Sequence, residues 1–82
     1  MFHEGTIGIP QKGSNKMIAA HYWVKAFEEG SEWGINGGRI SKLSIKINGV
    51  FTANYDRGWD IEPDEKDEAT QIAYCILLQN YN

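Results

Sequence analysis

Four residues in the middle of this 82-residue chain have the types and spacing of an anion-binding site. Arg39 and Ser41 open one predicted strand, and Arg57 and Trp59 follow the next one. In an antiparallel hairpin the start of the first strand lies beside the end of the second, so we expect all four side chains at one end of a sheet, on one face. Two guanidinium groups, a hydroxyl and an indole suit a phosphate that bears a stackable base.

The residues around these four extend the predicted site. Gly37 and Gly38 precede Arg39, tolerate positive φ and could present backbone N–H groups as an anion-binding nest. Lys42 is expected to project to the opposite face, where it would contribute only from an edge or across a subunit boundary. The predicted ligand-binding set is Arg39, Ser41, Arg57, Trp59, Trp33 and Lys42.

A structural role for the same residues is the alternative that the sequence leaves open. The C-terminal helix is expected to run back antiparallel to the fourth strand, which places its N-terminus over this end of the sheet. Its first acids could then pair with Arg39 and Arg57, while Trp59 caps the core or stacks on Arg57. The acids concerned are Asp64, Asp67 and Glu68.

No other pattern indicates catalysis or metal binding. The acids between Asn54 and Asp64 suggest a calcium loop, but Gly58 takes the third ligand position of the EF-hand pattern. His3 and His21 lack zinc spacing. The segment 34–38, GINGG, is neither a Walker loop nor a dinucleotide fingerprint. We therefore expect no enzymatic activity, no metal and no cofactor.

Length and composition predict a single domain, residues 1–82. The hydrophobic fraction of 41% argues against disorder, but so short a chain buries little apolar surface, so we expect a homo-oligomer. Cys75 is the only cysteine, which excludes an intrachain disulfide and fits a reducing cytosol. No apolar run approaches the length of a membrane span, and the N-terminal residues lack a signal-peptide core. The expected location is the cytoplasm, without a membrane partner.

The net charge of −3 is unevenly distributed along the chain. Six basic residues lie between residues 12 and 46, whereas seven acids lie between residues 56 and 68. The simple interpretation of the acidic run is a solvated helix start. The overall acidity argues against a general DNA binder, which would carry a basic stripe.

Period-two alternation predicts strands at residues 2–9, 18–28 and 40–47. Asn48-Gly49 then predicts a hairpin into a fourth strand. A plain two-residue turn would mix polar and core faces, whereas a register shifted by one would align Phe51, Ala53 and Tyr55 with the core residues of the preceding strand. We therefore expect a bulged hairpin.

The only long predicted helix is residues 65–81, with Asp64 as its N-cap. Its predicted core stripe is Ala69, Ile72, Ala73, Ile76 and Leu77. Tyr74 and Leu78 would lie on its far side and mark a subunit contact. The fold class is therefore α+β, a four-stranded antiparallel meander with one C-terminal helix packed on one face.

One helix leaves the other face of such a sheet uncovered. Trp23 and Phe27 are expected there, beside Lys25, Lys42 and Lys46. Two large aromatic side chains are unusual on a solvated face, which favours burial in an oligomer over an open ligand platform. The predicted interface set is Trp23, Phe27, Tyr74 and Leu78.

Three segments resemble a family of small uncharacterised domains found in Firmicute bacteria and their tailed phages. These segments are residues 22–25 (YWVK), 34–43 (GINGGRISKL) and 54–60 (NYDRGWD). The resemblance covers residues 22–82 and implies a fold and a mobile-element context, without an activity.

Three functions remain open from the sequence. The first is a non-enzymatic phage or mobile-element protein that sequesters a nucleotide or phosphorylated ligand, as an anti-defence protein would. The second is a protein-interaction module that blocks a host nuclease or polymerase, with its acidic surface mimicking nucleic-acid phosphate. The third is stacking of single-stranded RNA or DNA on Trp23, Phe27, Lys42 and Lys46, against which the net charge weighs.

Overall fold

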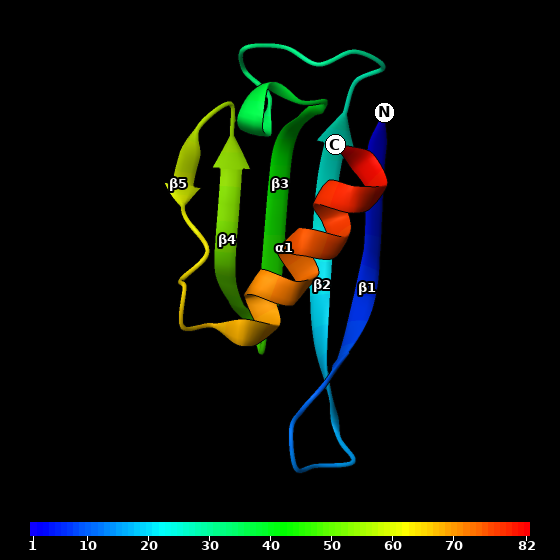
Figure 1. The fold of residues 1–82 in the computed structure, drawn as a ribbon, viewed down its shortest axis with the longest axis vertical. Helices are drawn as coiled ribbons and strands as arrows, with labels where there is room; N and C mark the ends of the chain where they lie inside the picture. Colours follow the sequence, from blue (N-terminus) through cyan, green and yellow to red (C-terminus); the bar gives the residue numbers. More distant parts are fainter.

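Five antiparallel strands form one sheet in the order of the sequence, and a single α-helix crosses one face of it (Figure 1). The computed structural model describes residues 1–82. Its elements are β1 (Phe2–Pro10), β2 (Met17–Ala26), the 3-10 turn η1 (Ile35–Gly37), β3 (Ile40–Ile47), β4 (Val50–Asp56), β5 (Trp59–Ile61) and α1 (Glu68–Tyr81). The predicted α+β meander with a C-terminal helix is confirmed, with five strands in place of four. Neither helix has the length and apolar character needed to cross a membrane.

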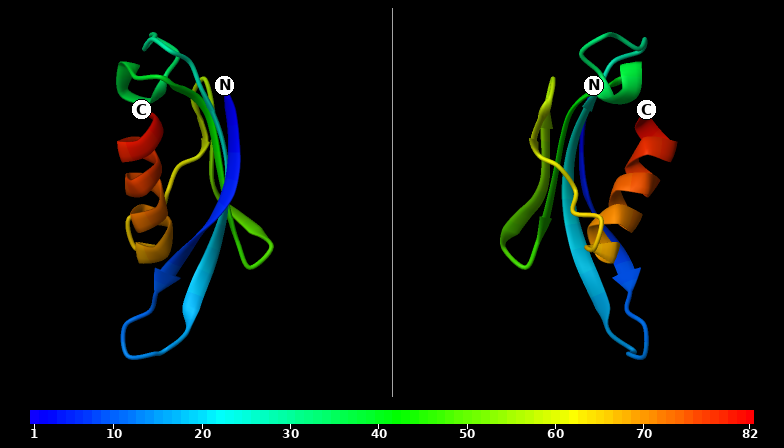
Figure 2. Two further views of the ribbon diagram at one scale, coloured as in Figure 1. Left: turned by 90° about the vertical axis from the view of Figure 1, so that its right-hand side faces the viewer. Right: turned by 60° about the vertical axis from the view of Figure 1, so that its left-hand side comes forward.

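The core lies between the sheet and α1, and Figure 2 shows the helix on one side of the strands. Ala20 and Val24 of β2 and Leu43 and Ile45 of β3 are at most 1% exposed. Alternate side chains of a strand point to the same face, so Trp23 and Ser44 face away from the helix. The expectation that Trp23, Lys42 and Lys46 lie on the uncovered face is therefore confirmed.

Asn48 and Gly49 form the turn between β3 and β4, with positive φ angles of 52° and 78°. The pairing starts in plain register, with Lys46 opposite Phe51, and a bulge then shifts it so that Ala53 enters the core at 0% exposure. The bulged hairpin is confirmed. The prediction for Phe51 is wrong, because this residue precedes the shift, lies on the face away from α1 and is 46% exposed.

Strand β5 determines where the helix begins. It pairs antiparallel with β4, and the segment after it carries the chain back to the end of the sheet where β3 joins β4 (Figure 1). Helix α1 begins at this end, where the Thr70 and Thr52 hydroxyl groups form a hydrogen bond of 2.7 Å. The expectation that the helix N-terminus lies over Arg39 and Arg57 is wrong, because it took no account of this returning strand.

Helix α1 also begins later than predicted. Its first residue is Glu68, and its N-cap is Asp67, whose side chain accepts a hydrogen bond from the Thr70 N–H at 3.1 Å. Asp64 forms a separate turn, in which its carbonyl oxygen accepts from the Asp67 N–H at 3.0 Å. Asp64 is therefore not the N-cap of the helix.

The inward face of α1 is rotated relative to the predicted stripe. Ala73 and Leu77 are buried as predicted, but Ile72 is 38% exposed. Tyr74 and Leu78 pack against the core, so the expectation that they lie on the outer side of the helix is wrong. A subunit contact through these two residues stays a prediction.

The C-terminal residue joins α1 to the loop between β2 and β3. The side chain of Asn82 accepts a hydrogen bond from the Ile40 N–H at 3.0 Å and donates one to the Ile35 carbonyl oxygen at 3.1 Å. A side chain at Gly38 would collide with Asn82, so glycine is required for this close approach. The loop is thereby held at the end of the sheet where β3 begins.

Candidate functional site

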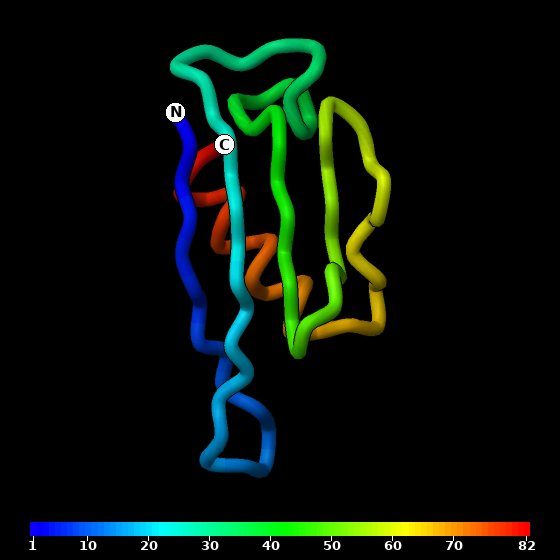
Figure 3. The backbone as a smooth tube through the Cα atoms, turned by 180° about the vertical axis from the view of Figure 1, so that it is seen from behind, coloured from blue at the N-terminus to red at the C-terminus, as the bar shows by residue number.

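An open groove of about 290 Å³ lies at the end of the sheet where β3 begins and β4 ends. Figure 3 shows the sheet from the side away from α1, on which the groove lies. The groove is lined by Lys25, Phe27, Ser31, Trp33, Ser41, Lys42 and Arg57. Four residues of the predicted ligand-binding set therefore meet here, namely Trp33, Ser41, Lys42 and Arg57.

A register shift between β2 and β3 brings Ser41 and Lys42 into the same groove. Lys25 pairs with Lys42, but the next residue, Ala26, pairs with Ile40, so Ser41 is the extra residue of a bulge. Ser41 is 7% exposed, and its hydroxyl donates to the Lys25 carbonyl oxygen at 3.4 Å. The expectation that Lys42 projects away from Ser41 is wrong, because strict alternation breaks at the bulge.

The groove concentrates positive charge. Lys25 and Lys42 lie directly opposite each other, an arrangement that lowers stability because the charges are alike. Arg57 follows β4 with a positive φ of 57°, and its N–H donates to the Ser41 carbonyl oxygen at 3.0 Å. Asp56 forms the only two ion pairs of the molecule, at 3.5 Å from Arg57 Nε and 3.9 Å from Lys42 Nζ. The lining of the groove holds three cations and no acid, Asp56 borders it, and Glu28, Glu29 and Glu32 lie exposed in the loop that supplies Ser31 and Trp33. Exposed ion pairs such as those of Asp56 are weak.

Two aromatic side chains stand open at the rim of the groove. Trp33 is 57% exposed and Phe27 is 50% exposed. The Tyr55 hydroxyl donates to the Trp33 carbonyl oxygen at 2.8 Å and so holds this part of the loop against β4. Lys25 Nζ lies 5.3 Å from the centroid of the Phe27 ring. Open aromatic faces beside cations suit the stacking of a planar base next to a phosphate.

Arg39 does not join this groove. It lines a separate hollow with the N-terminal residue and the last residues of α1. The predicted anion-binding nest is also wrong, because its donors are used within the loop. The Gly37 N–H donates to the Gly34 carbonyl oxygen at 3.0 Å, and the Gly38 N–H donates to the Ile35 carbonyl oxygen at 2.8 Å.

Trp59 lies at the edge of the core rather than in the groove. Its ring is edge-on to those of Tyr55 and Tyr74, with centroid distances of 4.9 and 5.5 Å. Burial in this cluster raises the pKa of Tyr74 above its usual value, and the neighbouring Glu62 and Tyr55 raise it further. For Trp59 the structural alternative left open by the sequence is therefore the one observed, whereas the helix acids form no ion pair with either arginine.

The predicted ligand-binding set omits three lining residues. Lys25 and Ser31 are absent from every predicted site, and Phe27 appears in the predicted interface and in the nucleic-acid alternative. The signal was present in β2 and just beyond it, because Lys25 and Phe27 alternate on the same face in the segment YWVKAF. Lys25 pairs with Lys42 in regular register, whereas the bulge at Ser41, which no pattern in the sequence predicts, shifts the pairing from Ala26 onward.

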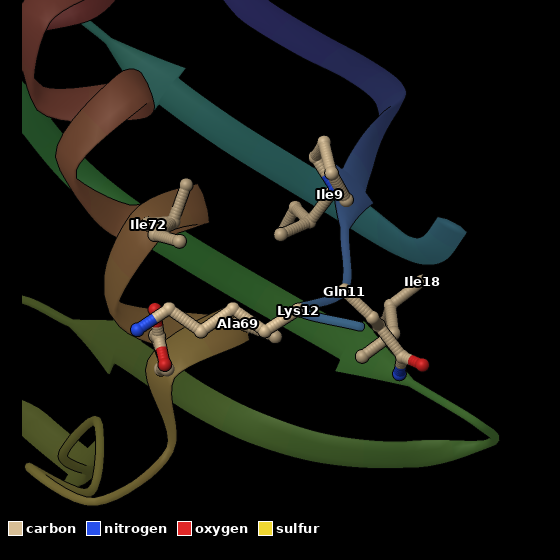
Figure 4. Close-up of a pocket in the computed structure, with 8 residues that line it drawn as sticks. Ile9, Gln11, Lys12, Ile18, Ala69 and Ile72 are labelled. Carbon is tan, nitrogen blue, oxygen red and sulfur yellow. The ribbon is translucent and has the colours of Figure 1, made fainter. Parts of the chain in front are cut away.

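A third hollow, between the β1–β2 hairpin and the start of α1, offers less for recognition (Figure 4). Its volume is about 160 Å³, and its walls are mostly aliphatic, with Lys12 and Glu68 as the charged side chains. The molecule holds no group of three or more His, Cys, Asp or Glu residues that could bind a metal ion. The groove beside Lys25 and Lys42 is therefore the candidate site.

Comparison with known proteins yields one family match over the whole length. The family model that matches residues 1–82 describes a domain of unknown function, DUF7678. The chain belongs to this family. No curated protein and no solved structure matches it. The resemblance to a small uncharacterised domain is confirmed in this coarse form, and DUF7678 membership assigns no ligand to the groove.

Proposed function

We propose that this DUF7678 protein is a non-enzymatic binding protein that holds a nucleotide or another phosphorylated ligand in the groove. The convergence of Lys25, Lys42 and Arg57 beside two open aromatic rings is the observation that supports this. Like charges opposite each other destabilise the free protein. A bound phosphate would relieve that repulsion, while a base would stack on Trp33 or Phe27.

The side chains of the groove favour binding without turnover. The Arg57 guanidinium is a planar fork that matches two phosphate oxygens, whereas Lys25 and Lys42 supply point charges. The groove contains no histidine or cysteine. The Ser41 hydroxyl donates to a backbone carbonyl oxygen rather than to a general base, so it lacks the activation of a nucleophile. Stoichiometric sequestration is the use that this chemistry supports.

The biological setting of the proposal comes from the resemblance to domains of Firmicute bacteria and their tailed phages. In that setting we propose a cytoplasmic anti-defence protein that sequesters a nucleotide signal made by the host. A homo-oligomer would present several grooves in one particle and would also add stability to so short a chain.

The proposal is tested by titrating the protein with nucleoside mono- and diphosphates, following tryptophan fluorescence and heat release. Arg57→Gln and Lys42→Gln should each weaken binding about 10- to 100-fold, because each removes a charged hydrogen-bond partner. Arg39→Gln is the matched control and should bind like the wild type, since Arg39 lies outside the groove. A panel of phosphorylated ligands without response, or an equal loss in Arg39→Gln, would contradict the proposal.

The second candidate is a protein-interaction module that uses the acidic segment between β5 and α1 to block a host nuclease or polymerase. Glu62, Asp64 and Glu65 are exposed there, and Glu68 is exposed at the start of α1, which supports this candidate. Other acids of the run have partners within the chain, since Asp67 caps α1 and Asp56 pairs with the groove cations. Salt-sensitive capture of a purified basic nuclease, abolished by Asp64→Lys and retained by Arg57→Gln, would favour this candidate over the first.

A further inference from the structure

We infer that the ligand is single-stranded DNA, laid across the open face of the sheet with the groove at one end of its path. This inference rests on the proposed phosphate-binding function of the groove and extends it to a longer surface. It is supported by an uncovered sheet face, by central strands that hold cations without acids, and by a second pair of aromatic rings beyond the groove.

The two central strands form a basic track on the uncovered face. Helix α1 covers the other face, as Figure 2 and Figure 3 show from three directions. Strands β2 and β3 contain no acidic residue. Lys25 pairs with Lys42 and His21 pairs with Lys46, so two rows of basic side chains cross this face. A track of this kind attracts successive phosphates of one strand.

The net charge of −3 does not describe the two central strands, because every acid of the chain lies outside β2 and β3. On the open face they are confined to the flanking strands, where Glu4 of β1 lies opposite Trp23. On the other flank, Asp56 ends β4 and Asp60 lies in β5. The remaining acids belong to the loop after β2, which also supplies Ser31 and Trp33 to the groove, and to the segment from β5 to α1. Local charge, rather than the sum over the chain, determines what the open face attracts.

A second pair of aromatic rings, Trp23 and Phe51, lies on the same face beyond Phe27 and Trp33 of the groove. The rings of Trp23 and Phe51 are 6.0 Å apart, and Lys46 Nζ is 5.1 Å from the Phe51 centroid. Phe51 is on this face because of the bulge in β4, and it is 46% exposed. Trp23 and Phe27 are four positions apart, which corresponds to about 13 Å of extended chain. One nucleotide cannot contact both the aromatic rings of the groove and the Trp23–Phe51 pair, whereas successive nucleotides of one strand can.

A single DNA strand fits the face better than other occupants. A second copy of the chain would bring two lysine-rich faces together, which like charges oppose. A duplex keeps its bases stacked inside and leaves the aromatic rings unused. An RNA 2′-hydroxyl would find few free donors on this face, because the Ser44 and Thr6 hydroxyl groups already form hydrogen bonds within the chain. The Ser44 hydroxyl donates to Asn54 Oδ1 at 2.8 Å, and the hydroxyl of Thr6 is 2.9 Å from His21 Nδ1.

The test is fluorescence anisotropy of labelled oligothymidylates of about 4, 8 and 12 nucleotides, with thymidine monophosphate as a competitor. The affinity of the protein for an oligothymidylate should rise with the length of the oligonucleotide until it reaches from the groove to the Trp23–Phe51 pair. The logarithm of the affinity should fall with the logarithm of the salt concentration, with a slope of about −0.7 for each contacted phosphate.

Variants outside the groove separate this inference from the proposed function. Phe51→Ala should weaken the binding of the longest oligonucleotide about 5- to 100-fold, and Lys46→Gln should reduce its salt slope by about 0.7. Neither change should alter the affinity for thymidine monophosphate, because both residues lie outside the groove. Lys66→Gln is the charge-matched control on the segment before α1, and it should bind like the wild type.

Each contrary outcome has a distinct meaning. Equal affinity for thymidine monophosphate and the longest oligonucleotide, or unchanged oligonucleotide binding by Phe51→Ala, would overturn the inference and leave the groove as a nucleotide site. Absence of binding by both ligands would overturn the inference and the proposed function together. Tighter binding of oligouridylate than of oligothymidylate would overturn the assignment to DNA.

Discussion

At the scale of single residues, Asn82 connects the helix to the loop that builds the groove. Asn82→Ala leaves the Ile40 N–H and the Ile35 carbonyl oxygen without their side-chain partner. We expect the free energy of unfolding to fall by about 1–3 kcal/mol, the cost of unpaired buried polar groups. Asn80→Ala, at an exposed position of the same helix end, should change it by less than about 0.5 kcal/mol. Urea denaturation measures both, and equal effects would contradict this role for Asn82.

Tyr74 makes stability depend on pH in the alkaline range. Burial raises its pKa, and Glu62 and Tyr55 raise it further. Because the folded pKa exceeds the unfolded value of about 10, the contribution to stability is complete below that value and is lost as pH rises through the folded pKa. Absorbance titration should resolve late-ionising tyrosine in the wild type and less of it in Tyr74→Phe. Tyr22 should still ionise late, because a hydrogen bond to Tyr81 raises its pKa. Identical titrations of both proteins would contradict this prediction.

At the scale of elements, two aspartates compete for the role of helix N-cap. Asp67 accepts a hydrogen bond from the Thr70 N–H and another from the Thr70 hydroxyl, at 3.1 and 2.7 Å. Asp67→Ala should therefore lower the free energy of unfolding by about 0.5–2 kcal/mol. Asp64→Ala should have a smaller effect, because Asp64 lies in a turn outside the helix. Thermal unfolding of the two variants decides between them, and a larger loss in Asp64→Ala would restore the helix start indicated by the sequence.

The sequence predicts most elements, because alternation and turn chemistry act locally. Asn48-Gly49 predicts its turn and bulged hairpin, and the alternation of β2 and β3 predicts their core faces. The short strand β5 is missed, since three residues around Trp59 give too little alternation to recognise. Without β5, the expected helix runs in the opposite direction along the sheet. Its N-terminus is then placed over the candidate site instead of at the other end of the sheet.

The candidate site is predicted in part, because it depends on register. Ser41, Lys42 and Arg57 lie where β3 begins and β4 ends, which the hairpin alone predicts. The bulge at Ser41 then brings Ser41 beside Lys42 in the groove, while Arg39 lines a separate hollow. A shift by one residue changes which side chains share a face, and no local pattern in the sequence reports it.

At the scale of the whole molecule, the single helix divides the sheet into a core face and a free face. The open face carries the lysines of β2 and β3, with Trp23, Phe27 and Phe51 beside them. A homo-oligomer with Trp23 and Phe27 at its interface stays a prediction. Within one chain Trp23 already packs near Phe51, and Phe27 lines the groove. A subunit and a nucleic-acid strand would compete for these residues.

The groove as a phosphate-binding site is tested most directly by backbone amide chemical shifts of isotope-labelled protein during titration with thymidine monophosphate. We predict saturable shifts at the groove residues, strongest near Lys42, Arg57 and Trp33, with none around the aliphatic hollow lined by Ile9 and Ile72. Unchanged spectra, or shifts confined to the aliphatic hollow, would contradict the account.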